Sequence, residues 1–261
     1  MRTLEFIGTA TTLLRLGPFT VLTDPNFLHR GQRAHLGYGL TSRRRTEPSA
    51  QPADLPALDA VLLSHLHGDH FDRIARNGLS HELPVLTTPH ARKVLKRWGF
   101  RHALGLDTWA SEQLERDGAV LRTTSVPGQH APGPLRHVLP PVMGTVLELE
   151  APGTPTFRVY LSGDTLYRPR LREIVDRCGP LDAAVLHLGG TRVLGVTVTM
   201  DGGQGADLVE LLRPALTVPV HFDDYPVFRS PRSDFEAEWT RRGLPGTLRL
   251  VGRGEVVDLH V

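Results

Sequence analysis

The chain has 261 residues, a formal net charge of +2 at pH 7 with neutral histidines, and one cysteine, Cys178. This length can bury the core of one domain, because sandwich and barrel folds reach it without dividing, so we expect a single domain over residues 1–261. The balanced charge argues against a nucleic-acid partner, and one cysteine excludes both an internal disulfide and a cysteine-rich zinc site.

The amino-terminal segment predicts a meander of three strands. Short apolar runs at residues 4–7, 11–16 and 19–23 are separated by turns that contain glycine, and the third run ends at Asp24-Pro25. The chain has neither the long apolar stretch of a signal peptide nor a run long enough to span a bilayer. We therefore expect a soluble, cytoplasmic protein, whose oligomeric state the sequence leaves open.

Residues 26–56 show no clear period and contain Arg43, Arg44 and Arg45. Long irregular segments in compact domains are usually functional or mobile. We expect this loop to border the entrance for a small-molecule substrate, with its arginines favouring an anionic group. A solvated basic loop is the alternative.

Four potential metal ligands lie within six residues, directly after an apolar run at residues 58–63 that predicts a buried strand. Side chains two apart on an extended segment point the same way, so His65 and His67 can converge on one ion. The next glycine can adopt backbone angles that other residues avoid, which would turn Asp69 and His70 towards a second position. A satisfied core or surface histidine is the ordinary explanation for one histidine, but not for three with an aspartate. Imidazole and carboxylate ligands without thiolate suit zinc, and also manganese or iron.

The segment from His65 to His70, His-Leu-His-Gly-Asp-His, resembles the HxHxDH motif of the metallo-β-lactamase superfamily of binuclear metal hydrolases. The resemblance implies an α/β fold: an αββα sandwich of two mixed β-sheets flanked by helices.

Residues 6–11 and 22–25 are similar to the opening of one branch of that superfamily, which contains N-acyl-phosphatidylethanolamine phospholipase D and ascorbate-phosphate lactonase types. In that branch the aspartate before the proline lies close to the metals. The resemblance therefore implies that Asp24 orients a ligating histidine by accepting its second N–H. A simple Asp-Pro turn is the alternative.

Strand and helix patterns alternate after the motif, which predicts a mixed sheet with helices packed outside it. Helices are predicted over residues 71–76, 91–98 and 206–212. Strands are predicted over residues 84–87, 143–150, 157–161, 181–188 and 217–221, with hairpins over 114–126 and between 248–251 and 256–261.

Three downstream segments match the superfamily's ligand positions in the expected order. The sequence from Pro127 to His130 matches a Pro-x-x-His ligand, and His221 at a strand end matches the final ligand. Asp164, in Ser-Gly-Asp-Thr, matches the aspartate that bridges both metals, since two carboxylate oxygens can reach ions about 3.5 Å apart. A turn that caps the helix near Arg168 is the alternative for Asp164.

Other positions depart from the branch or fit two explanations. His187 stands near a common proline position, and it is either a substrate-facing acid or a core histidine. Residues 222–225, Phe-Asp-Asp-Tyr, replace the usual Trp-Gly-Thr, so the branch's substrate specificity should not be carried over. Arg136 and His137 can contact substrate or simply pack in their proline-rich loop.

The resemblance implies two divalent metal ions, with zinc as the first candidate and manganese or iron as alternatives. The first ion would be held by His65, His67, His130 and Asp164, and the second by Asp69, His70, Asp164 and His221. Two cations would lower the pKa of a shared water from about 15.7 towards 7 and so produce a metal-bridging hydroxide. Asp69 is the expected catalytic residue, because it can orient this hydroxide and accept its proton.

We therefore expect a metal-dependent hydrolase of a small ester, lactone or phosphodiester. A nuclease is one alternative, although it needs a coherent basic groove and the arginines here are spread widely. A non-catalytic metal-binding protein of the same fold is the other, although a structural site needs neither two metals nor an open coordination position.

Overall fold

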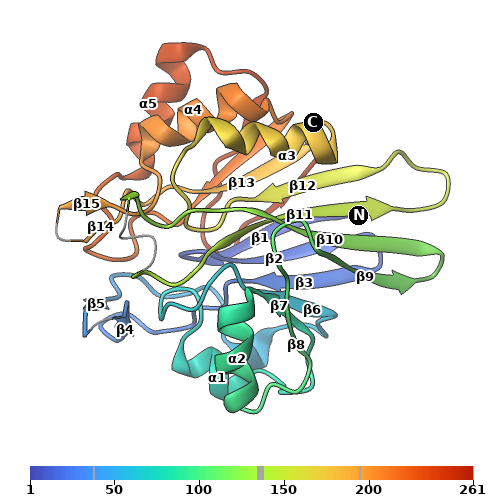
Figure 1. Ribbon diagram of the computed structural model, residues 1–261, viewed down its shortest axis with the longest axis horizontal. Helices are drawn as coiled ribbons and strands as arrows, with labels where there is room; N and C mark the ends of the chain where they lie inside the picture. The colour runs from blue at the N-terminus through green and yellow to red at the C-terminus, as the bar shows by residue number, and fades with distance from the viewer. Residues whose placement is uncertain (38, 134–137, 194, 261) are drawn as a thin grey trace.

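The computed structural model describes residues 1–37, 39–133, 138–193 and 195–260. Two seven-stranded sheets pack face to face, and helices cover the outer face of each sheet (Figure 1). The predicted αββα sandwich of two mixed sheets is therefore confirmed.

The first sheet combines the amino-terminal meander with three parallel strands, in the order β18-β1-β2-β3-β6-β7-β8. Its strands are β1 (Arg2–Gly8), β2 (Thr11–Leu16), β3 (Phe19–Thr23), β6 (Ala60–Leu62), β7 (Val85–Thr87), β8 (Ala103–Gly105) and β18 (Val256–Asp258). Because β3 and β6 run parallel, their carboxyl ends meet at one edge, and this edge carries Asp24 and the segment that begins at Ser64.

The second sheet has the order β17-β16-β13-β12-β11-β10-β9, with antiparallel pairs from β9 to β12 and parallel pairs from β12 to β17. Its strands are β9 (Ser111–Arg116), β10 (Ala119–Pro127), β11 (Met143–Glu150), β12 (Phe157–Leu161), β13 (Ala183–His187), β16 (Leu216–Val220) and β17 (Thr247–Leu248). The parallel strands β12, β13 and β16 again bring their carboxyl ends to a common edge.

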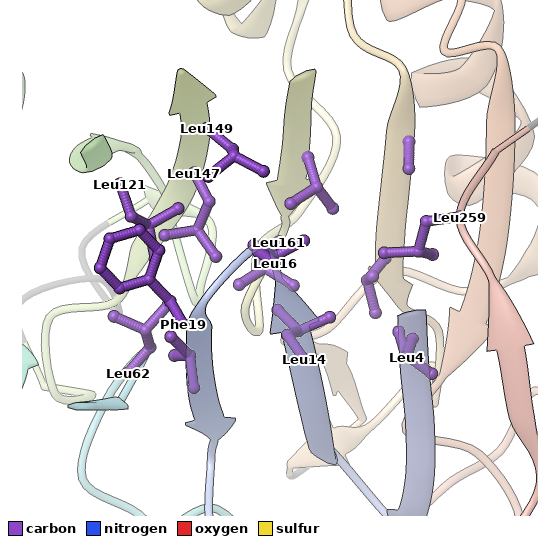
Figure 2. Packing of buried hydrophobic residues seen from close by; sticks show 14 of the residues in the cluster. Leu4, Leu14, Leu16, Phe19, Leu62, Leu121, Leu147, Leu149, Leu161 and Leu259 are labelled. Carbon is purple, nitrogen blue, oxygen red and sulfur yellow. The ribbon is translucent and has the colours of Figure 1, made fainter. Parts of the chain in front are cut away.

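The main core lies between the sheets, where apolar side chains from one sheet pack against those of the other. Figure 2 shows Leu14 and Leu16 of β2 in the same layer as Leu147 of β11 and Leu161 of β12. Alternation of buried and less buried residues along β10 follows from the two-residue period of a strand. The two sheets are thus held together by apolar contact over their inner faces.

Helices form the outer layers: α1 (Arg73–Gly78) and α2 (Pro89–Arg97) on the first sheet, and α3 (Glu173–Cys178), α4 (Gly202–Leu212) and α5 (Arg232–Arg242) on the second (Figure 1). Short 3-10 helices are η1 (Pro52–Asp54) and η3 (Pro169–Arg172). Within the described ranges, no helix is both long and apolar enough to cross a bilayer.

Two short hairpins project from the same end of the molecule, one from each half of the chain (Figure 1). They are formed by β4 (Arg33–His35) with β5 (Thr41–Arg43), and by β14 (Arg192–Val193) with β15 (Val196–Thr197). The first lies inside the loop for which the sequence shows no period, because strands of three residues are too short to produce one.

The predicted carboxyl-terminal hairpin is wrong. Strand β17 pairs in parallel with β16, whereas β18 pairs in antiparallel with β1, so the two strands belong to different sheets. Short apolar runs separated by glycines predict strands, but they do not determine the partner. Here each run extends the open edge of one sheet. Residue 261, the last of the predicted hairpin, lies outside the described residues.

Candidate metal centre

Three histidine nitrogens converge at one end of the sandwich. His65 and His67 follow β6, and His130 follows β10. His67 Nδ1 lies 3.1 Å from His65 Nε2 and 3.4 Å from His130 Nε2. Nitrogens that share a tetrahedral zinc ion at 2.0–2.1 Å must lie about 3.3–3.4 Å apart. The spacing of this group therefore fits a metal ion.

The protonation of this first group also suits metal binding. His130 Nδ1 lies 2.8 Å from the Val198 carbonyl oxygen, which can only accept, so Nδ1 carries the proton and Nε2 is left with a lone pair. Burial lowers the pKa of His130, lowers that of His67 to about 4, and holds that of His65 well below its usual range. All three imidazoles are therefore neutral at pH 7, the form that binds metals.

A second group forms beside the first. His221 Nε2 lies 3.6 Å from Asp69 Oδ2, and His70 Nε2 lies 3.4 Å from Asp164 Oδ1. The same Asp164 oxygen lies 3.5 Å from His221 Nδ1. Potential ligand atoms of Asp164, His65 and His70 also fall within 4.8 Å of one another. Asp164 thus contacts the second group and lies close to His65 of the first, and the structure brings together all seven residues that the sequence identified as ligands.

Asp164 is held as an anion by its surroundings. Burial alone would raise its pKa, but His221 and His70 outweigh this effect and keep the pKa well below its usual range. Its other oxygen, Oδ2, accepts a hydrogen bond from Thr199 Oγ1 at 2.8 Å. The Asp164 side chain does not cap the following helix, because the cap position of η3 is Arg168 and no side chain caps there. The alternative of a capping turn is therefore excluded.

Several buried polar atoms of the centre have no hydrogen-bond partner among the described residues: His70 Nε2, Asp69 Oδ1, Asp164 Oδ1 and both ring nitrogens of His221. Buried polar atoms are nearly always paired in folded proteins. Unpaired nitrogen and oxygen atoms that face one another are explained if they are ligands of cations. The residues present therefore fit the binding of metal ions.

Asp24 lies behind this centre. Its Oδ1 accepts the backbone N–H of Ser64 at 2.7 Å, while Oδ2 lies 3.2 Å from His70 Nδ1 and 3.3 Å from His187 Nε2. Burial would raise the pKa of Asp24, but the two histidines lower it to about 2. Asp24 is therefore ionised. Its Oδ2 accepts a hydrogen bond from His70 Nδ1, while the other ring nitrogen, Nε2, faces Asp164.

His187 is a buried histidine that contacts Asp24 rather than open space. Its Nδ1 lies 3.2 Å from Ser162 Oγ, and burial lowers its pKa. A cavity lies above the centre, with His67, Asp69, His130 and Asp164 in its lining, and His187 is not among the described residues that line it. Between the two explanations that the sequence left open, its position favours the core histidine.

The glycine of the motif has a different role from the predicted one. Gly68 is not among the residues with a positive φ, so the turn does not require unusual backbone angles. A Cβ atom at this position would instead lie 2.6 Å from the backbone nitrogen of His35 in β4. The Gly68 N–H donates to the His35 carbonyl at 2.8 Å. Glycine is needed here because two backbones approach closely.

The loop over residues 26–56 carries three consecutive arginines, which were expected either to favour an anionic substrate or to be solvated. Arg44 fits neither expectation. Arg43 and Arg45 are exposed, but Arg44 is fully buried, and its Nη2 lies 3.9 Å from Asp224 Oδ1. Asp224 also accepts the backbone N–H of Thr9 at 3.0 Å. None of the three arginines lines the described part of the cavity. Arg44 is a buried structural cation, which the sequence run of three arginines could not distinguish from its neighbours.

Sequence reasoning missed Ser64 and Thr199, whose hydroxyls contact ligand side chains. Ser64 Oγ lies 3.0 Å from His65 Nδ1. The signal for Ser64 is its place directly before His65 at the end of β6, whereas Thr199 lies shortly before α4, which carries no proposed ligand. Arg136 and His137 lie outside the described residues.

Comparisons with known proteins agree with this geometry. A family model described as a beta-lactamase superfamily domain matches residues 20–222. A Deinococcus radiodurans protein described as a UPF0173 metal-dependent hydrolase is 27% identical over 259 residues, which cover 99% of this chain and 100% of the relative.

Two solved structures share the fold over nearly the whole chain. A possible metal-dependent hydrolase from Veillonella parvula has a TM-score of 0.81 at 24% identity, covering 98% of this chain and 99% of its own. An isothiocyanate hydrolase from Delia radicum gut bacteria has a TM-score of 0.79 at 21% identity, covering 98% of each chain. At such identities the likeness shows the fold alone.

Proposed function

The chain belongs to the beta-lactamase superfamily, and from this premise we propose that it is a metal-dependent hydrolase that uses two metal ions to cleave a small ester, lactone or phosphodiester. The observation that carries the proposal is the position of Asp164 between the two groups of ligands. Its unpaired Oδ1 lies 3.4 Å from His70 Nε2 and 3.5 Å from His221 Nδ1, and potential ligand atoms of Asp164, His65 and His70 lie within 4.8 Å of one another. A relative described as a metal-dependent hydrolase and matched along its whole length supports it.

In this proposal His65, His67 and His130 hold one ion, and Asp69, His70 and His221 hold the other, with Asp164 shared between them. We expect zinc, with manganese or iron as alternatives, because the donors are nitrogen and oxygen without sulfur. When bound, two such ions supply the activation of a water molecule and the polarisation of the substrate oxygen.

The protein's own residues would position the reaction. Asp69 lines the cavity above the centre, and its Oδ1 has no hydrogen-bond partner among the described residues. It can therefore accept a hydrogen bond from an attacking water and take its proton. Asp24 would hold His70 in one orientation by accepting from its Nδ1.

The narrower relationship to the branch with phospholipase D and lactonase types remains part of this proposal. The Asp24-Pro25 pair and the Pro127–His130 segment support it. Residues 222–225 depart from the pattern of that branch, so its substrates are not carried over.

The test is elemental analysis of the purified protein together with hydrolysis assays on an ester, a lactone and a phosphodiester. We expect about two metal ions per chain and turnover of at least one substrate class. Asp164→Ala should lose at least one ion and at least about 100-fold in kcat/KM, because the shared ligand is gone. The matched control is Asp176→Ala, which removes an exposed aspartate from α3 and should change neither quantity. Full metal content and full turnover in Asp164→Ala would disprove the shared ligand.

A further inference from the structure

A cavity of about 260 Å³ opens directly above the metal centre. Four of the proposed ligands, His67, Asp69, His130 and Asp164, contribute to its lining. A substrate bound in this cavity would therefore contact the proposed reaction site.

The rest of the described lining is almost entirely aliphatic. The loop between β4 and β5 contributes Leu36 and Leu40, and the β14–β15 hairpin contributes Val193 and Val196. Three further aliphatic residues, Val138, Leu139 and Val198, and the polar Thr191 complete the described lining. The two hairpins come from different halves of the chain and lie at the same end of the molecule (Figure 1).

The pleat of the β14–β15 hairpin determines which side chains face the cavity. Val193 and Val196 are directly paired across the hairpin and therefore lie on the same face, and both line the cavity. The next pair along the hairpin, Arg192 with Thr197, belongs to the opposite face. Arg192 is accordingly exposed and lines a different surface pocket. The hairpin thus presents valine to the cavity and directs its arginine away.

The loop over residues 26–56 likewise presents aliphatic side chains to the cavity and keeps its three consecutive arginines out of the described lining. Leu36 and Leu40 line the cavity, whereas Arg44 is buried beside Asp224, and Arg43 lies on β5 outside the described lining. Apart from the metal ligands themselves, no charged side chain belongs to the described lining. An anionic group placed against these leucines and valines would lose its hydration without gaining a partner.

We propose that the natural substrate is a neutral ester or lactone of a short aliphatic acid, whose apolar acyl part occupies this cavity. The inference rests on the proposed hydrolase function and specifies its substrate class. Burial of an aliphatic chain releases water from apolar surface, which favours binding. The volume lies below the range of about 300–1,000 Å³ typical of sites for drug-sized ligands, so the acyl part is small.

The first experiment measures kcat/KM of the metal-loaded protein with nitrophenyl esters that differ only in the acyl group. From acetyl to butyryl, kcat/KM should rise about fourfold for each added methylene, as expected for burial of one CH₂ group. The butyryl and succinyl esters have the same number of acyl carbons, but only the succinyl ester carries a carboxylate. The butyryl ester should be preferred by at least about tenfold.

The second experiment changes residues that line the cavity. Leu40 is 43% exposed, so Leu40→Lys can place a cation at the cavity without burying it. This variant should reverse the preference towards the succinyl ester. Leu104→Lys is the matched control, because Leu104 is 39% exposed on β8 and lies outside this cavity, and it should keep the preference for butyryl. Val196→Lys is a second wall variant that should behave like Leu40→Lys.

The outcomes separate this inference from the proposed function. A metal-loaded protein that cleaves none of the ester, lactone and phosphodiester substrates would overturn both. A protein that cleaves the succinyl ester or a phosphodiester better than the butyryl ester would keep the hydrolase function and overturn the apolar substrate class. Equal shifts in Leu40→Lys and Leu104→Lys would also overturn it, because the cavity wall would then not determine the preference.

Discussion

At the scale of single residues, Asp24 connects the backbone of the first sheet to a proposed ligand. It accepts from Ser64 N–H at 2.7 Å and lies 3.2 Å from His70 Nδ1. Its φ of 37° lies in the left-handed region, which is uncommon outside glycine. His221 shares this feature, with a φ of 62°. Such backbone conformations persist where the surrounding structure enforces them, and they cluster at functional sites.

Replacing the Asp24 carboxylate tests whether it orients His70. Asp24→Asn keeps the size of the side chain but removes the charge that favours the Nδ1–H tautomer of His70. We expect metal affinity to fall by about 10–100-fold, as for other residues that orient a ligand. Competition with a chromogenic chelator measures the affinity. The exposed Asp258→Asn, on β18, is the control, and an unchanged affinity in Asp24→Asn would show that His70 needs no such support.

The proposed metal ligands and Asp24 behind them were accessible from the sequence, whereas the other supporting residues were not. His65, His130, Asp164 and His221 each follow closely on an apolar strand, a position that sequence patterns can recognise. Thr199 and Arg44 act through contacts with residues that are distant in the chain, and their sequence surroundings resemble those of ordinary loop residues. A hydroxyl or guanidinium gains such a role only from the packing of separate loops.

At the scale of elements, a buried network joins the loop before β6 to the segment after β16. Arg44 Nη1 donates to the Asn26 carbonyl at 2.9 Å, and Nη2 lies 3.9 Å from Asp224 Oδ1. Asp224 Oδ2 accepts from Thr9 N–H at 3.0 Å, and the Thr9 carbonyl accepts from His221 N–H at 2.7 Å. The backbone of a proposed ligand is thus fixed through this network.

Removing the buried cation should destabilise the protein. Arg44→Met leaves Asp224 with Arg253, whose Nη2 lies 2.7 Å from Asp224 Oδ1, but it removes the buried Arg44 charge and its hydrogen bond to the Asn26 carbonyl. We therefore expect the free energy of unfolding to fall by about 1–3 kcal/mol. The free energy of unfolding from urea titration measures the change. Arg43→Met, at an exposed position in the same run, should shift it by no more than about 0.5 kcal/mol. Equal values for the two variants would show that the buried pair does not stabilise the fold.

The elements themselves were predicted unevenly, and length explains the difference. Strands β2, β3, β11 and β12 occur with the predicted bounds, because runs of five or more residues show the apolar pattern of a strand. Strands β4 and β14 are too short for a pattern, and the partner of β17 depends on which sheet edge is open. Helix α5 was missed because most of its residues are polar and only Phe235 is fully buried.

At the scale of the whole molecule, the centre joins the two halves of the sandwich. His65, His67, Asp69 and His70 follow a strand of the first sheet, whereas His130, Asp164 and His221 follow strands of the second. The cavity is likewise lined by one hairpin from each half. Cations that bind at this junction would therefore connect the carboxyl-end edges of both sheets, in addition to the apolar core between them.

Metal removal should consequently lower the thermal stability of the entire fold. A ligand that binds only the folded state stabilises it by about 2.7 kcal/mol when its free concentration is 100 times Kd. For a chain of this length, we expect chelation to lower Tm by about 5 °C or more, since 1 kcal/mol corresponds to about 2–4 °C. Thermal unfolding with and without chelator, followed by addition of excess zinc, measures the effect and its reversal. Asp164→Ala should respond less to chelation, because it has lost the ligand that we propose both groups share. If chelation removed the metal and left Tm of the natural protein unchanged, the ions would contribute to chemistry without connecting the two sheets.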